Sequence, residues 1–419
     1  MNALSGDTYL FAEVDGKYGV FTLKELYELH NQGHKIKVPT LLNERGEKGW
    51  KEVENVVSFR KQNMKKITGT RSRLYTEASE NTTIPAYSPN LFSGIEEQIK
   101  MRLKSVNELN VTQDHRYNDT FLLTMRFPLN LPEGDQTDWE YGFTLGFFLS
   151  EGNLEYRKHK NTKQSLATLN GLARKKGMTL EEYLNYKTDI ERVSLAIGRS
   201  DFERGYVGIL KKHFKFTTFR KVSENGYEIF SSDLSLIHMI KNYTEGHTSH
   251  DKHVKNEVYN RSLKFLEGVL QGFLAGDGSF HKNADLFQVG ITTNYRLYND
   301  LIFLAKLLGY DIHLHNGHFA KSPSGKLFYV LSLSVSKRWH RHSALGLVRE
   351  HIKKIEDVGE KDAFNLVLKP LYSENDKRAK FNHLFFTAYG FLVSDAVKTL
   401  DRRALNSSLP VERRGDAQG

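Results

Sequence analysis

The sequence predicts a multidomain protein in which a β-rich part, formed by both ends of the chain, encloses a central α+β part. Three observations support this fold class. Short apolar runs between turn residues, typical of strands, fill the first hundred residues and return near the C-terminus. Longer helical stretches alternate with strands in the centre. The order of these central elements roughly recurs, which indicates an internal duplication.

The predicted elements follow from apolar periodicity and from flanking turn residues. In the N-terminal part we expect strands at 8–14, 18–21, 36–42 and 53–59, a helix at 23–30, and a loop at 77–95, which is polar and contains two prolines. In the centre we expect helices at 139–152, 180–190, 202–214, 234–243, 263–278 and 295–308, and strands at 193–198, 216–222, 227–231, 286–293, 312–315 and 327–335. Strands at 364–368, 385–387 and 390–393 close the β-rich part, and the tail 402–419 is expected to be unstructured.

Composition narrows the class of protein. The 419 residues include 60 Lys and Arg and 50 Asp and Glu, so the net charge is +10, which favours a polyanionic partner. Hydrophobic residues make up 39% of the chain, which excludes wholesale disorder. Cysteine is absent, which excludes disulfides, thiolate metal sites and a cysteine nucleophile. There is no apolar run of membrane-spanning length and no signal-peptide pattern, so we expect a soluble cytoplasmic protein.

The most informative motifs are GFTLGFFLSEG at 142–152 and GVLQGFLAGDG at 268–278. Residues four apart share one face of a helix, so each segment presents a stripe of small residues. Glycine inside a helix costs about 1 kcal/mol relative to alanine, which close contact between two helix backbones would offset. If the stripes face each other, the helices end side by side at Glu151 and Asp277, each followed by glycine.

Two carboxylates at the negative ends of two helix dipoles repel each other. A divalent cation removes this conflict, and oxygen ligands without His or Cys suit Mg²⁺ far better than Zn²⁺. We therefore expect Glu151 and Asp277 to bind Mg²⁺. The alternative is a glycine-faced helix pair that serves only as an interface.

The segment LQGFLAGDG at 270–278 resembles the second motif of the LAGLIDADG homing endonucleases, and TLGFFLSEG at 144–152 resembles a looser first copy. Two copies in one chain are similar to the single-chain members of that family. The resemblance implies an α+β pseudo-dimer with two saddle-forming sheets, acting as a monomer on a long, asymmetric site in double-stranded DNA. It also implies that Glu151 and Asp277 bind the metals that activate water and stabilise the leaving oxygen.

The same resemblance implies DNA-contacting cations on the two sheets. The candidates, each with a solvated surface position as the alternative, are Arg157, Lys158, Lys160, Arg192, Arg220, Lys221, Lys282 and Arg296. The family often has a lysine at the end of the last strand of each half. Lys337 fits this role as a catalytic aid, whereas the first half has Ser231 and Ser232 there. Because Glu151 is one methylene longer than the expected Asp, a nuclease-dead DNA-binding protein is a second alternative.

The ends of the chain carry a resemblance to inteins. ALSGDTYLF at 3–11 resembles the opening block, VTQDH at 111–115 resembles the block that orients the N-terminal scissile peptide, and HLFFTAYGFLVSD at 383–395 resembles the closing block. The positions that the resemblance assigns to splicing are Ala3, Thr112, His115, Ser394, Asp395 and Ala396.

These positions lack the chemistry of splicing, which needs a nucleophile at the first residue, a terminal Asn and a second nucleophile after it. Ala3 and Ala396 have no nucleophilic atom, Asp395 replaces Asn, and Ser394 replaces the usual His. In addition, Asn365 stands where many inteins have Asp. We therefore predict that the chain does not splice. A mutated, trapped splicing precursor and a natural degenerate intein both fit these residues.

Together the motifs predict four regions. Residues 1–136 and 355–396 form an all-β Hedgehog/intein-type domain, 137–350 form an inserted LAGLIDADG domain, and 397–419 form a flexible tail or extein remnant. The predicted function is that of a site-specific, Mg²⁺-dependent homing endonuclease in a splicing-inactive intein.

Overall fold

The computed structural model describes most of the chain. The described residues are 2–43, 46–70, 72–87, 100–114, 118–124, 127–158, 166–175, 177–182, 189–246, 248–281, 286–292, 294–314, 318–321, 327–336, 347–396 and 407–408. They divide into two compact units: unit 1 comprises Met1–Pro132, Phe280–Gly290 and Leu301–Gly419, and unit 2 comprises Glu133–Ser279 and Ile291–Asp300. No helix among the described residues has the length and apolar character needed to cross a membrane.

Unit 1 is dominated by an antiparallel sheet with the strand order β24-β8-β7-β9-β21-β1-β6-β5-β4-β2-β3. Its N-terminal elements are β1 (Leu4–Ser5), β2 (Tyr9–Val14), β3 (Lys17–Thr22), α1 (Leu23–Asn31), β4 (Ile36–Leu41), β5 (Lys48–Gly69), β6 (Tyr75–Ser79), β7 (Thr83–Tyr87), β8 (Lys100–Ser105), η1 (Val106–Glu108) and β9 (Thr120–Thr124). Its C-terminal elements are β21 (Leu347–Leu368), η6 (Ala379–Phe381), β22 (Leu384–Phe386), β23 (Leu392–Ser394) and β24 (Ser407–Ser408). The β-rich part is therefore built from both ends of the chain, as predicted.

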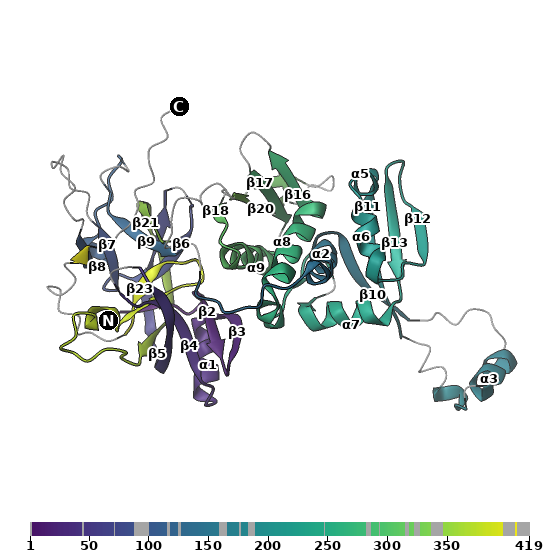
Figure 1. Cartoon of the computed structure of the whole chain (residues 1–419), viewed down its shortest axis with the longest axis horizontal. Helices are drawn as coiled ribbons and strands as arrows, with labels where there is room; N and C mark the ends of the chain where they lie inside the picture. The colour runs from purple at the N-terminus through teal and green to yellow at the C-terminus, as the bar shows by residue number, and fades with distance from the viewer. Residues whose placement is uncertain are drawn as a thin grey trace. The chain divides into compact units, whose positions relative to one another are not determined.

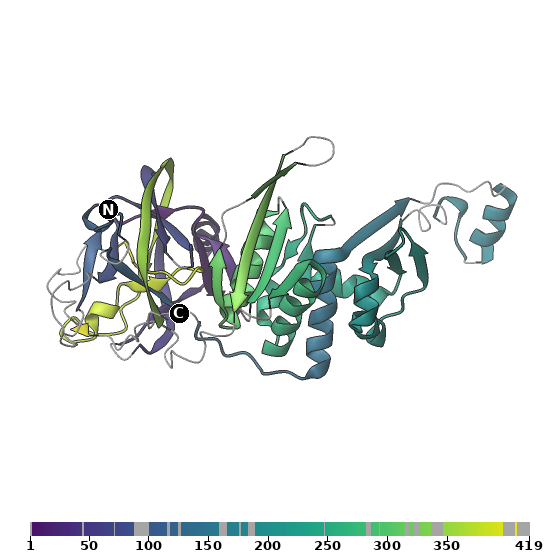
Figure 2. The same ribbon diagram turned by 90° about the horizontal axis from the view of Figure 1, so that it is seen from above.

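The longest described strands, β5 and β21, pair with each other as a curved antiparallel ribbon (Figure 2). Each has 22 residues, whereas the sequence predicted only the short strands 53–59 and 364–368. The missed length is polar and partly exposed: residues 60–63 are all solvent-exposed, so no apolar alternation marks them as a strand. Pairing between distant segments, which propensity does not reveal, holds this ribbon together.

Three other predictions in unit 1 are wrong in part. Within the predicted loop 77–95, β6 and β7 form strands, because their backbones pair with β5, β8 and β9 despite a polar sequence. Strands β8 and β9 were not predicted. In the tail 402–419, β24 pairs with β8 through residues 407–408; the other tail residues lie outside the described ones.

Unit 2 is built around two adjacent helices, α2 and α8 (Figure 1). The elements of this unit are α2 (Gln136–Glu151), β10 (Gly152–Lys158), α3 (Leu166–Lys175), β11 (Asp189–Gly198), α5 (Arg199–Glu203), α6 (Tyr206–His213), β12 (Thr218–Lys221), β13 (Gly226–Ser231), α7 (Leu234–Tyr243), β14 (Thr244–Glu245), β15 (His253–Val254), η3 (Asn256–Asn260) and α8 (Leu263–Asp277). Strands β10, β11, β13 and β12 form an antiparallel sheet in that order.

Two helix predictions in unit 2 need correction. The predicted helix 202–214 is two helices, α5 and α6, because Gly205 between them adopts a left-handed φ of 78°. The predicted helix 180–190 is helical where it begins, at residues 180–182, but its last residues belong to β11, which begins at Asp189 and pairs with β10. Residues 183–188 lie outside the described ones, and the earlier helix α3 was not predicted.

After α8 the order helix, two strands, helix and further strands returns. The elements are β16 (Gly278–His281), β17 (Leu286–Thr292), α9 (Tyr295–Leu307), β18 (Asp311–Leu314), β19 (His318–Lys321) and β20 (Leu327–Ser336). The sheet order is β16-β17-β20-β18, with β19 also paired to β20.

The C-terminal half of α9 packs into the core of unit 1. The ring of Phe303 lies 5.4 Å from that of Tyr9 and 5.7 Å from that of Tyr389, measured between centroids. Lys306 is fully buried, and its Nζ donates to the carbonyl of Thr124 at 3.2 Å. The β-rich sheet and the C-terminal half of α9 therefore share one core within unit 1.

Candidate functional site

The two glycine-striped segments form α2 and α8, and their stripes face each other as the sequence predicted. A Cβ atom on Gly146 would lie 2.0 Å from the carbonyl oxygen of Val269, and one on Gly272 would lie 2.1 Å from that of Phe143. Real Cβ atoms do not approach backbone this closely, so glycine is required at both positions. The helices therefore touch backbone to backbone.

This contact can be tested with Gly146→Ala. We expect the free energy of unfolding to fall by about 1–3 kcal/mol, because the added methyl forces the two helices apart. The matched control is Gly208→Ala in α6, where an added Cβ would have no atom within contact distance. This substitution should stabilise the helix by up to about 1 kcal/mol. Urea denaturation measures both. Equal effects of the two variants would contradict the packing argument.

The helix contact brings the two acidic residues together at the ends of α2 and α8. A Cβ on Gly276 would lie 2.2 Å from Ser150 Oγ and 2.8 Å from Glu151 Cγ, so the side chain of Glu151 lies against the last turn of α8, which ends at Asp277. Glu151 is half-buried and Asp277 is exposed. The pair is therefore accessible to a ligand from outside.

Both carboxyl groups have raised pKa values. The pKa of Glu151 rises to about 7, mainly because desolvation disfavours its charge and then because Asp277 and Asp201 are negative. Desolvation also raises the pKa of Asp277, and the positive charge of Lys252 opposes this shift. Ionising these two carboxyl groups therefore costs more free energy than it would in water.

Lys252 supplies one positive charge beside this pair, and sequence analysis missed it. Its fully buried Nζ donates to the carbonyl oxygens of Phe148 at 2.8 Å and Gly152 at 2.5 Å, so it caps the end of α2. Burial lowers the pKa of Lys252 to about 8, against the opposing effect of Asp277 and Glu151. The lysine lies 100 residues from Gly152 in a polar stretch, where no motif or periodicity marks it.

The donor set fits a divalent cation. Adjacent carboxylates with raised pKa values gain most from a metal that favours their ionised forms, and hard oxygen ligands favour Mg²⁺ or a similar ion. Glu151 and Asp277 are the residues that would hold it. Among the described residues there is no cluster of three or more His, Asp or Glu side chains that would offer a competing metal site.

The predicted DNA-contacting residues lie in several places. Arg192 on β11, and Arg220 and Lys221 on β12, belong to the sheet of unit 2, as do Arg157 and Lys158 on β10. Arg296 on α9 lies 3.6 Å from the buried carboxylate of Asp300. Ser231 donates to the carbonyl of Lys215 at 2.6 Å. The positions outside the described residues are Lys160, Lys282 and Lys337.

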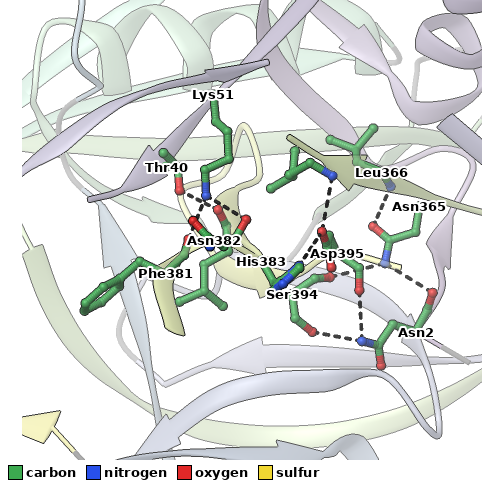
Figure 3. Close-up of polar contacts among 12 residues, drawn as sticks. Asn2, Thr40, Lys51, Asn365, Leu366, Phe381, Asn382, His383, Ser394 and Asp395 are labelled. Atoms are coloured by element: carbon green, nitrogen blue, oxygen red, sulfur yellow. Dashed lines mark hydrogen bonds and ion pairs between the residues drawn. The ribbon is translucent and has the colours of Figure 1, made fainter. Parts of the chain in front are cut away.

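In unit 1, Asn2 near the start of the chain meets Asn365 and the segment that ends at Asp395 (Figure 3). The side-chain amide of Asn2 donates to Ser394 Oγ at 3.2 Å and to the carbonyl of Asp395 at 2.9 Å. The amide of Asn365 donates to the carbonyl oxygens of Asn2 and Ser394, both at 3.2 Å. The carbonyl groups of the two residues that precede Ala3 and Ala396 therefore both accept hydrogen bonds from amides.

Ala3 is held by a residue that sequence analysis did not identify. Its N–H donates to Thr82 Oγ1 at 3.0 Å, and this hydroxyl donates back to the carbonyl of Ala3 at 2.7 Å. The hydroxyl of Thr112 instead donates to Asp114 and Asn118. His115 lies outside the described residues. The threonine beside Ala3 is thus Thr82, which stands in a Thr-Thr pair without a recognised spacing.

Asp395, at the end of the closing block, is buried in a polar pocket. Its carboxylate accepts the N–H of Leu368 at 3.2 Å and lies 3.1 Å from Nδ1 of His383 (Figure 3). Lys51, fully buried nearby, donates to the carbonyl oxygens of Phe381 and Asn382, each at 2.7 Å. Burial lowers the pKa of Lys51 to about 7, and the negative charge of Asp395 opposes this shift.

Comparison with known proteins gives weak similarities to two families. No protein-family model matches the chain, and no curated protein matches it significantly. Solved structures similar to parts of the chain include LAGLIDADG homing endonucleases and inteins. A variant of I-DmoI in complex with its target DNA is 14% identical, with a TM-score of 0.32, over 49% of this chain and 90% of that one.

Two further structures are similar over part of the chain. An intein from a hyperthermophile is 21% identical with a TM-score of 0.24, over 30% of this chain and 73% of that one. The I-SmaMI LAGLIDADG homing endonuclease bound to cleaved DNA is 15% identical with a TM-score of 0.25, over 48% of this chain and 79% of that one.

The raised pKa of Glu151 predicts a pH-dependent stability. The pKa of Glu151 is about 7 in the folded protein and 4.5 in the unfolded chain. The unfolding free energy contributed by the protonated carboxyl group is therefore fully present below about pH 4.5 and is lost as the pH rises through 7. In EDTA, wild type should lose more unfolding free energy between pH 5 and pH 8 than Glu151→Gln. Urea denaturation at both pH values measures this. The control is Glu203→Gln, which removes a carboxylate from an exposed ion pair with Arg199 and should lose as much unfolding free energy as wild type. An equal loss in all three proteins would contradict a raised pKa at Glu151.

Proposed function

We propose that this chain is a site-specific, Mg²⁺-dependent homing endonuclease for double-stranded DNA, embedded in a splicing-inactive intein-type domain. In this proposal residues 137–350 act as the nuclease, and residues 1–136 and 355–396 as the intein-type domain. The observation that carries the nuclease proposal is the meeting of Glu151 and Asp277 at the ends of two glycine-packed helices. The net charge of +10 supports a polyanionic substrate.

Each residue of the site has a proposed role. Glu151 and Asp277 hold Mg²⁺, which when bound supplies charge neutralisation at a scissile phosphate and an acidified water. Lys252 fixes the end of α2 through two carbonyl groups and so sets the position of Glu151. Its ammonium group also adds positive charge where a phosphate approaches. Lys337 is proposed as a further supporting cation.

The proposed substrate is a long, asymmetric duplex site read by the two sheets of a monomer. The proposed phosphate and groove contacts are Arg157, Lys158, Lys160, Arg192, Arg220, Lys221, Lys282 and Arg296. This assignment rests on the resemblance and, for Arg157, Lys158, Arg192, Arg220 and Lys221, also on their positions on strands. Arg296 lies on the helix α9 and rests on the resemblance alone.

Cleavage is tested with a plasmid in which the codons before Ala3 are joined directly to those after Asp395. Wild type with Mg²⁺ should linearise this plasmid, and Asp277→Asn should reduce the rate at least about 100-fold, because it removes a metal ligand. Glu203→Gln, an exposed carboxylate variant, should cleave as wild type does.

Three other outcomes discriminate the alternatives. If the protein binds the plasmid but does not cut it, the chain is a nuclease-dead DNA-binding protein, in which the longer Glu151 misplaces the metal. Unchanged cleavage by Asp277→Asn would leave the helix pair as an interface only. A plasmid that neither binds nor is cut would refute the DNA-directed function.

We further propose that the intein-type domain retains the hydrogen bonds around its two splice-site positions but cannot carry out the splicing reaction. Amide donors contact the carbonyl groups of Asn2 and Asp395, and Thr82 contacts the N–H of Ala3, yet Ala3 offers no nucleophile. An acyl shift at the Asn2–Ala3 peptide bond is therefore impossible in this chain.

A tagged precursor tests this proposal. The wild-type chain between two affinity tags should give no spliced product and no thiol-induced cleavage on denaturing gels. Ala3→Cys should allow dithiothreitol to release the N-terminal tag, because a thiol then stands where Thr82 holds the peptide N–H. Ala3→Ser is the control that does not form a thioester. Splicing by the unmodified chain would contradict the proposal.

A further inference from the structure

One face of the unit 2 sheet carries a charge-balanced array of side chains. The register places Glu155 opposite Arg192 and Arg220 opposite Glu228, with Phe230 on the same face as these four residues. The opposite face is apolar and buried, as shown by Leu154, Val193, Leu195, Ile197 and Ile229. Because side chains alternate along a strand, the five residues of the array project together away from the core.

Arg192 is tightly held within this array. Its Nη2 and Nε atoms lie 2.6 Å and 2.7 Å from Oε2 of Glu155. Its guanidinium carbon lies 4.0 Å from the ring centroid of Phe230. Only 15% of the Arg192 side chain is exposed, so ion pairing and stacking both order it before any ligand arrives.

Arg220 approaches the same ring from β12, the strand on the other side of β13 from β11. Its guanidinium carbon lies 5.6 Å from the centroid of Phe230, and it forms an ion pair with Glu228. In contrast to Arg192, 61% of this side chain is exposed. The two arginines thus flank one aromatic ring, each with its own carboxylate, and the four charges of the array sum to zero.

A neutral array is unexpected on a DNA-binding face of a protein with a net charge of +10. Arginines that contact phosphate or guanine must exchange their carboxylate partners for the nucleic acid, and any carboxylate left beside DNA repels it. A duplex with well-placed hydrogen-bond acceptors offsets the loss of these ion pairs, whereas a duplex without such acceptors does not. Repulsive groups of this kind create specificity rather than affinity.

We propose that Glu155 and Glu228 determine DNA specificity by neutralising Arg192 and Arg220 in the free protein. This inference rests on the proposed DNA-directed function and assigns a role to two carboxylates that lie outside the metal site. The carboxylates suppress binding to arbitrary DNA, and the arginines are released only by a sequence whose base edges and phosphates replace them.

The test is Glu155→Gln in the full chain, with a short fluorescent duplex of random sequence as the probe. Binding is measured by anisotropy over a range of salt concentrations. We expect several-fold tighter binding than wild type, and a salt dependence whose slope is steeper by about 0.9, the value for one additional phosphate neutralised. Glu228→Gln should act in the same direction.

Glu203→Gln is the matched control, because it makes the same charge change at the exposed Arg199 pair on α5, outside the array. Its affinity should stay within twofold of wild type. In an Arg192→Gln background, Glu155→Gln should give no gain. Should Glu155→Gln fail to fold, as judged by circular dichroism, Glu228→Gln decides the test alone.

Two results would overturn the inference in different ways. If Glu155→Gln and Glu228→Gln bind the random duplex no better than Glu203→Gln, the carboxylates have no such role, while the nuclease proposal stands. If wild type shows no salt-dependent binding of any duplex, including the joined insertion site, the proposed function fails and this inference fails with it.

Discussion

The contact between the backbones of α2 and α8 is the constraint on which the position of Glu151 and Asp277 depends. Glycines on both helices remove the side chains that would keep them apart, and a single methyl at Gly146 would overlap a carbonyl group. Since the last turns of the two helices lie against each other, the same contact places Glu151 beside the end of α8. The helix packing therefore also sets the positions of the acids. The glycines lower the stability of each helix in isolation, but they allow the close contact that brings Glu151 and Asp277 together.

Glu151 and Asp277 place two acidic groups close together at the ends of α2 and α8. The pKa of Glu151 rises to about 7, and the pKa of Asp277 also rises, so ionising both carboxyl groups costs free energy that a nearby cation would offset. Lys252 offsets part of this cost, although its ammonium group is held by two carbonyl groups at the end of α2. The resulting site is acidic and is exposed to solvent at Asp277.

In unit 1, the C-terminal half of α9 is buried against the β-rich sheet. The ring of Phe303 contacts that of Tyr9, and the ammonium group of Lys306 donates to the carbonyl of Thr124. Removing the sheet would expose both side chains. Around Ala3, Thr82 and Asn365 hydrogen-bond the backbone, while Ala3 itself offers no nucleophilic atom.

Sequence by itself determined the local features. The helical period placed the two glycine stripes and the acids that follow them, and the residue types at 3, 394, 395 and 396 led to the prediction that the chain does not splice, because both inferences depend only on neighbours in the chain. Tertiary structure alone decided the length of β5 and β21, the contacts of Lys252 and Thr82, and the pairing of Arg192 with Glu155. Each arises where segments distant in sequence meet, and a buried lysine or a paired glutamate has the same letter as a solvated one.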